Sequence, residues 1–131
     1  MTKQLLSEEW IKEYGELWNT TPETTEGTSD LTVTIVYRVA EDTDNRRAQI
    51  NLENGEVVYA GAVQEDKEPD FTLTAKLDVW RQFADGKLRA QRAIMMKKLK
   101  FDGPLMVALS HLSGLEAALG LFGRVTETEW S

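Results

Sequence analysis

Apolar and polar residues alternate in three short segments of the chain before residue 76. Every second residue is apolar over residues 31–39, 48–52 and 71–75. Successive side chains of a strand point to opposite faces, so this alternation predicts strands with one face buried. Residues 19–30, which are rich in threonine, and the polar residues 64–70 are predicted to be loops.

A tight turn is predicted between the second of these strands and a fourth one. Asn54-Gly55 is a strong hairpin signal, because both residues tolerate positive φ. A two-residue turn at this point would pair Leu52 with Val57. Ile50 and Tyr59 would form the next pair, so that apolar side chains stack on one face.

A second pattern, with apolar residues three or four positions apart, predicts helices. These helices span residues 7–18, 79–84, 89–96, 104–112 and 115–124. A brief strand over residues 99–101 separates the third from the fourth, and residues 126–131 are expected to be frayed. Strands therefore cluster early and helices late, which favours an α+β fold with an antiparallel sheet.

The composition narrows the kinds of site that the chain can carry. Its 131 residues form one domain, and its net charge of −7 argues against a nucleic-acid partner. Without cysteine there is no thiolate nucleophile and no cysteine-ligated metal. No apolar run reaches the length of a membrane helix and no secretory signal is visible, so a cytoplasmic protein is expected.

Two adjacent residues, Ser110 and His111, are the strongest candidates for catalysis. A serine nucleophile needs a spatially opposed base and an orienting acid, whereas neighbouring residues of one helix point apart. His111 is therefore expected to be a surface or hydrogen-bonded residue. No paired acid and base occurs elsewhere, so the sequence predicts a protein that is not an enzyme.

One acidic segment matches part of a calcium-binding loop. Asp42, Asp44 and Glu53 stand at positions one, three and twelve of the pattern. The sixth position needs glycine for a sharp turn, and Arg47 occupies it here. The match is therefore interpreted as chance, and neither a metal nor a cofactor is expected.

The late helices carry more apolar surface than a small sheet needs to cover. Methionine, which adapts to irregular space and varied ligands, is frequent among these residues. This surplus predicts a cavity for a lipid with a long apolar chain. The predicted lipid-binding residues are Trp80, Phe83, Leu88, Ile94, Met95, Leu105, Met106, Leu109, Leu112, Leu115, Leu119 and Phe122.

Basic residues gather around the short third helix, although the chain as a whole is acidic. Arg89, Arg92, Lys97 and Lys98 could form a solvated face, or a patch that contacts a lipid headgroup or a membrane surface. Each basic residue near anionic lipid contributes about 1 kcal/mol, so transient membrane contact is a second interpretation.

Residues 70–112 also resemble the sterol carrier protein 2 family of lipid-binding domains. The family pattern of Thr-x-Thr, an aromatic helix, Gly-Lys, a short helix and Lys-Leu-Lys corresponds to Thr72-Leu73-Thr74, Trp80, Gly86-Lys87, residues 91–96 and Lys98-Leu99-Lys100. Gly103 then precedes another helix, as it does in the family. Two positions differ, with Ala90 where the family usually has proline and Lys97 where it usually has glycine.

This resemblance implies a five-stranded, mainly antiparallel sheet with helices on one face. An apolar tunnel between the layers would accept a fatty acid, fatty acyl-CoA, a phospholipid or a sterol, without catalysis. The last helix, residues 115–124, would close the tunnel as a lid. The alternative is an accessory or dimerisation subunit that presents a lipophilic intermediate to a partner enzyme. A monomer or weak dimer is expected.

Overall fold

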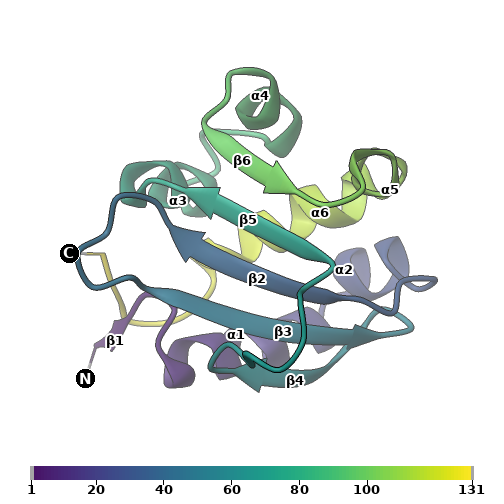
Figure 1. The fold of residues 1–131 in the computed structure, drawn as a ribbon, viewed down its shortest axis with the longest axis horizontal. Coiled ribbons are helices and arrows are strands. Elements are labelled where there is room, and N and C mark those ends of the chain that lie inside the picture. The colour runs from purple at the N-terminus through teal and green to yellow at the C-terminus, as the bar shows by residue number, and fades with distance from the viewer. Residues whose placement is uncertain (1, 131) are drawn as a thin grey trace.

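A twisted five-stranded sheet forms one layer of the molecule (Figure 1). The computed structural model describes residues 2–130. The spatial order of the strands is β4-β3-β2-β5-β6, and only the pair β2 and β5 is parallel. The strands are β2 (Thr34–Val39), β3 (Arg47–Glu53), β4 (Glu56–Gly61), β5 (Phe71–Ala75) and β6 (Leu99–Asp102). The predicted α+β class with a mainly antiparallel sheet is confirmed.

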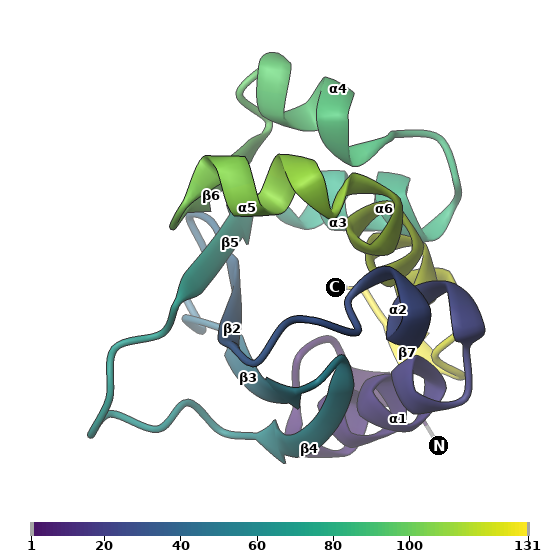
Figure 2. The same ribbon diagram turned by 90° about the vertical axis from the view of Figure 1, so that its right-hand side faces the viewer.

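Helices α1, α2 and α6 lie on the same side of this sheet (Figure 2). The helices are α1 (Glu8–Asn19), α2 (Pro22–Gly27), α3 (Leu77–Ala84), α4 (Ala90–Met95), α5 (Leu105–Ser110) and α6 (Leu112–Gly120), followed by the 3₁₀ turn η1 (Leu121–Gly123). Each predicted helix is present. However, the last two divide at His111, three residues before Gly114, and Pro104 is the N-cap of α5 rather than its first residue.

The hairpin between β3 and β4 forms at Asn54-Gly55, where both residues have positive φ. Leu52 pairs with Val57 as predicted, but Ile50 pairs with Ala60 and not with Tyr59. The register shifts between Asn51 and Leu52, because β4 carries one extra residue at this point. A bulge of this kind cannot be recognised from the alternation of apolar and polar residues in the sequence.

The prediction of a loop over residues 19–30 is wrong, because this segment contains α2. Pro22 stands in the first turn of this helix and Glu23 follows it, as at many helix starts. Buried threonine hydroxyls then donate to carbonyl oxygens: Thr24 to Trp18 at 2.7 Å and Thr28 to Thr24 at 2.7 Å. The threonines that indicated a loop instead satisfy the backbone of a short, buried helix.

The prediction of a frayed C-terminus is also wrong for the described residues. Strand β7 (Thr128–Glu129) pairs in parallel with β1 (Lys3–Gln4). The Trp10 indole N–H donates to the Thr128 hydroxyl at 3.0 Å, and Trp130 packs against the core. Contacts more than one hundred residues apart in sequence hold this tail, so local patterns could not reveal it.

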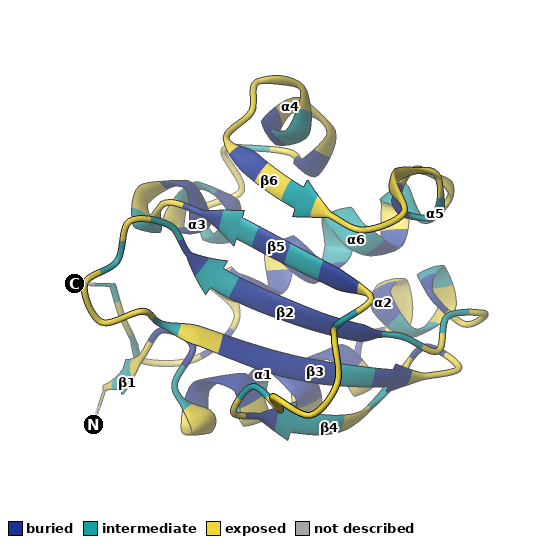
Figure 3. Ribbon diagram, in the orientation of Figure 1, coloured by how far each residue is buried: buried dark blue, intermediate teal, exposed yellow. Residues whose placement is uncertain are grey.

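Many residues of the sheet and of helices α1 and α3 are buried (Figure 3), and several of them are aromatic. The Phe122 ring stacks on Trp80 with 4.8 Å between centroids and lies 4.9 Å from the ring of Trp10. The Tyr14 hydroxyl donates to the carbonyl oxygen of Ala118 at 2.9 Å, and the Tyr37 hydroxyl donates to Tyr14 at 2.9 Å. At this end of the interior the rings are buried and pack directly against one another.

Candidate functional site

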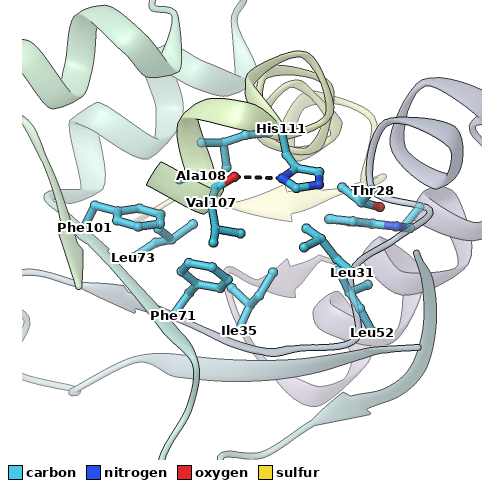
Figure 4. A pocket seen from close by; sticks show the side chains of 12 residues that line it. Thr28, Leu31, Ile35, Leu52, Phe71, Leu73, Phe101, Val107, Ala108 and His111 are labelled. Carbon is cyan, nitrogen blue, oxygen red and sulfur yellow. Dashed lines mark hydrogen bonds between the residues drawn. The ribbon is translucent and has the colours of Figure 1, made fainter. Parts of the chain in front are cut away.

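An apolar pocket lies at the other end of the interior, between the sheet and α5 (Figure 4). It is lined by Trp18, Thr28, Leu31, Ile35, Leu52, Phe71, Leu73, Phe101, Val107, Ala108, His111 and Leu115. The cavity volume is about 40 Å³, room for a few water molecules only, whereas ligand pockets measure roughly 300–1,000 Å³. In this conformation the space is therefore too small for a lipid, and the tunnel stays a prediction.

The side chains at the floor of this pocket come from alternate positions of three strands. Ile35, Leu73 and Phe101 come from the strands β2, β5 and β6, and their side chains point to the inner face. Phe71 and Phe101 face each other across neighbouring strands, with 5.3 Å between ring centroids. The sheet thus presents a continuous apolar wall that needs no polar partner.

Helix α5 forms the roof of the pocket and is held less firmly than the other helices. Val107 points down into the pocket and Ala108 lines it, whereas Met106 is 76% exposed (Figure 4). Leu105 and Leu109 are exposed as well. Only Ala108 of this six-residue helix is buried, so displacing α5 would expose little apolar surface that is not already in water.

Helix α6, by contrast, is anchored in the core. Ala118 and Leu119 are buried, and so is Phe122 of the following turn. Gly114 of α6 meets Gly27 of α2 so closely that a Cβ at Gly27 would lie 2.7 Å from the Gly114 Cα. Much of the segment expected to act as a lid is therefore packed into the interior, and its role as a lid stays a prediction.

His111 is the only titratable residue that lines the pocket. It stands between α5 and α6, and both of its ring nitrogens have acceptors. Nδ1 lies 2.7 Å from the carbonyl oxygen of Val107, and Nε2 lies 2.7 Å from the Asp30 carboxylate. The bond to Val107, and then the bond to Asp30, raise the pKa of His111 above its ordinary value. The bond to His111 in turn lowers the pKa of Asp30.

These shifts give a testable dependence of stability on pH. Because the pKa of His111 is raised, its contribution is complete below its usual pKa of about 6.5 and is lost as pH rises through the folded-state value. Because the pKa of Asp30 is lowered, its contribution exists above about 3.8 and is lost on further acidification. The contact between the two residues is therefore strongest between these values.

We expect NMR titration of His111, the only histidine, to show a midpoint above 6.5. In the variant Asp30→Asn the midpoint should fall, because the ring then keeps only the Val107 acceptor. A wild-type midpoint at or below 6.5 would contradict the contact.

Ser110 and His111 do not point apart as expected, because α5 ends at Ser110. The Ser110 hydroxyl lies 3.2 Å from Nδ1 of His111, but it donates to the carbonyl oxygen of Val107 at 2.9 Å. Nδ1 itself points its proton at the same carbonyl oxygen and cannot accept one from serine. The expectation of a hydrogen-bonded histidine is confirmed, and the geometry does not activate a nucleophile.

Of the twelve predicted lipid-binding residues, the structure places Leu115 in the wall of the pocket. Four of them, Trp80, Phe83, Leu119 and Phe122, are buried in the core. Leu88, Ile94 and Leu112 are partly buried against the core, and Met95, Leu105, Met106 and Leu109 are exposed. A role in lipid binding stays a prediction for all of these residues.

Most of the residues that line the pocket are not among the predicted lipid-binding residues. The inner-facing residues of the strands were visible as an alternating pattern and were expected to help hold an acyl chain, but none of them was named as a lipid-binding residue. Thr28 and Leu31 lie in or next to the segment that was taken for a loop. Only their position beside His111 in three dimensions marks them as part of a site.

The predicted basic patch lies around α4, away from the pocket lining. Arg89, Arg92, Lys97 and Lys98 are all exposed, and no ion pair of theirs occurs within residues 2–130. No residue of α4 lines the pocket. A contact with a headgroup or membrane thus remains a prediction for this patch.

Both departures from the family pattern have a structural consequence at α4. The backbone N–H of Ala90, which proline would lack, donates to the Glu116 carboxylate at 2.6 Å and ties α4 to α6. Lys97 has φ of 59° in the position that closes the helix, where Lys98 N–H bonds Ala93 O and Lys97 N–H bonds Ile94 O. Glycine is favoured there, because it has no Cβ to strain.

We expect Lys97→Gly to raise the free energy of unfolding by about 1 kcal/mol, because the left-handed conformation strains a residue with a Cβ. Gly86 closes α3 with the same two bonds and provides the reverse control. Gly86→Ala should lower stability by about as much, since its Cβ would meet no atom within 4 Å and only the backbone is strained. Urea unfolding of both variants measures this, and equal effects of the same sign would contradict it.

No metal site or membrane span is visible in the described part of the chain. Within residues 2–130, no three histidine, cysteine or acidic residues are placed to hold an ion. The Asp42 carboxylate instead accepts from the backbone and the guanidinium of Arg46 at 2.8 and 2.9 Å. None of the helices in this range has both the length and the apolar content that crossing a bilayer requires.

Comparison with known proteins places the chain in a family. The model of the SCP-2 sterol transfer family matches residues 11–115. A crystal structure of sterol carrier protein 2 is similar at a TM-score of 0.83 and 20% identity, over 93% of this chain and 99% of the other. A protein of Thermus thermophilus, described as possibly a sterol carrier protein, follows at 0.73 and 20% identity, over 93% and 92%.

A third similar structure is described as the ubiquinone synthesis protein UbiJ-SCP2. Its TM-score is 0.57 at 14% identity, over 86% of this chain and 90% of the other. No curated protein sequence matches the chain. Since the family model spans most of the sequence and the solved structures share the arrangement of sheet and helices, the resemblance predicted from residues 70–112 is confirmed: the chain belongs to the SCP-2 sterol transfer family.

Proposed function

We propose that the protein binds a lipid with a single long apolar chain in the pocket beneath α5, and carries or presents it without a chemical step. The observation that carries this proposal is the pocket wall, in which sheet and helix residues enclose an almost entirely apolar space. Membership of a lipid-binding family supports it. Apolar walls with few polar groups are typical of sites for such ligands.

The pocket has to enlarge before it can hold an acyl chain. Its volume of about 40 Å³ suits a closed, unliganded state, because an empty cavity of ligand size would cost several kcal/mol. Burial of each methylene group contributes about 0.8 kcal/mol, so an acyl chain can offset the displacement of a weakly held element. We propose that α5 is this element, because Val107 and Ala108 fill the pocket and its other apolar residues are already exposed.

We expect freshly purified protein to carry a mixture of lipids, detectable by native mass spectrometry. A matched sample after organic extraction should show the mass of the bare chain and should bind a fluorescent fatty acid at micromolar concentration. If both samples show bare protein and the fatty acid fails to bind, the proposed function is wrong.

A second candidate function is that of an accessory subunit for a partner enzyme. It is favoured by the exposed basic residues around α4, which form no ion pair within residues 2–130, together with the exposed Met95 and Met96. Methionine-rich surfaces adapt to partners, and a basic patch selects acidic ones. Stable co-purification with one enzyme, without free lipid, would favour this function over independent transport.

A further inference from the structure

The wall of the pocket contains one group that can carry charge. Of its twelve lining residues, only His111 is titratable, and none is lysine or arginine. The side chain of His111 is 16% exposed. It thus stands where an apolar interior meets water, which is where the polar end of a bound amphiphile has to lie.

The hydrogen bonds of His111 fix the direction of its two N–H groups. The carbonyl oxygen of Val107 can only accept, so Nδ1 carries a proton toward it at 2.7 Å. This bond holds the ring against α5. The Asp30 carboxylate, 2.7 Å from Nε2, also accepts, so the second N–H points out of the pocket wall at a carboxylate.

The Asp30 carboxylate is held only weakly beside Nε2 of His111. Its side chain is 75% exposed, and exposed ion pairs contribute little to stability. Thr28 and Leu31, on either side of it in the chain, line the pocket, so the carboxylate lies at the rim. A carboxylate brought by a ligand would meet the same N–H while its chain entered the apolar space.

We propose, on the basis of the function proposed above, that His111 binds the headgroup of the lipid, and that the carboxylate of a long-chain fatty acid replaces Asp30 at Nε2. The ligand class is then free fatty acids rather than neutral lipids. In the unliganded state Asp30 keeps the N–H of His111 paired. The contact breaks when the acid binds, while the packing of Gly27 against Gly114 stays in place.

The experiment compares palmitate with hexadecanol, which has the same chain length and no charge, in wild type and two variants. His111→Gln, which keeps a hydrogen-bond donor but cannot be charged, should weaken palmitate binding about tenfold, because charge-assisted bonds are the stronger ones. Its affinity for hexadecanol should stay within about twofold of wild type. At a pH below the His111 midpoint of both proteins, where the ring stays protonated, Asp30→Asn should bind palmitate more tightly, because the competing carboxylate is gone.

A spectroscopic readout separates headgroup binding from a structural role. Palmitate should shift the ring resonances of His111 in wild-type protein, and hexadecanol should not. If His111→Gln weakens both ligands equally, or neither, the inference is overturned, and in the second case the basic residues around α4 become the alternative headgroup site. If wild-type protein binds neither ligand, the proposed function itself fails along with it.

Discussion

Phe122→Ala is expected to lower the free energy of unfolding by about 3–5 kcal/mol, which is a large share of the stability of a typical domain. Phe122 is 1% exposed, and its ring contacts Trp10, Tyr14 and Trp80 at centroid distances of 4.8 to 5.3 Å. The rings that remain are large and are fixed by their own contacts, so they cannot collapse into the space. Thermal and urea unfolding, followed by circular dichroism, measure the loss.

Leu115→Ala is the matched control for this variant. Leu115 belongs to the preceding helix, is only partly buried, and lines the pocket. Its truncation should lower stability by clearly less and should weaken fatty-acid binding. If Phe122→Ala keeps its stability and instead loses lipid binding, Phe122 contacts the ligand as the sequence alone predicts, and the solid aromatic core is not the liganded state.

Val107→Trp is expected to weaken fatty-acid binding at least tenfold while leaving a folded protein. Val107 points into the pocket from α5 (Figure 4), so an indole there would occupy the space that an acyl chain needs. Because α5 buries only Ala108, the helix can move outward to accept the larger side chain at a modest cost in stability. Displacement of a fluorescent fatty acid measures the affinity.

Met106→Trp, one residue away, is the control for this second variant. The Met106 side chain is largely in water, so the same addition of bulk to the same helix should change affinity by less than about twofold. Equal losses in both variants would mean that the whole of α5 contacts the ligand. No loss in Val107→Trp would place the binding site outside this pocket.

The candidate site could be read from the sequence only in part. Surplus apolar helix residues predicted a ligand cavity, and Leu115 does line the pocket. Trp80 and Phe122 belong to the same apolar pattern, but they stack on each other in the core. The pattern could not separate these outcomes, because an amphipathic helix reports which side is buried and not whether the partner is a side chain or a ligand.

The contacts of His111 could not be predicted from the sequence either. In the sequence it stands beside Ser110, and nothing local connects it with Asp30, which lies eighty-one residues earlier. The break between α5 and α6 turns the imidazole toward that carboxylate and into the pocket wall. A hydrogen bond between distant segments depends on how the elements pack, and the spacing of residues along the sequence does not reveal that packing.

The amino-acid sequence by itself determined the strands of the five-stranded sheet, every α-helix except α2, the Asn54-Gly55 turn and the family, because alternation, helical spacing and turn residues act over a few neighbouring positions. Tertiary structure alone decided the helix within the threonine-rich segment, the pairing of β1 with β7, and the division of the interior into a solid aromatic core and a small pocket. These features depend on contacts between residues far apart in the chain, whose free energy is gained only once the sheet and helices have come together.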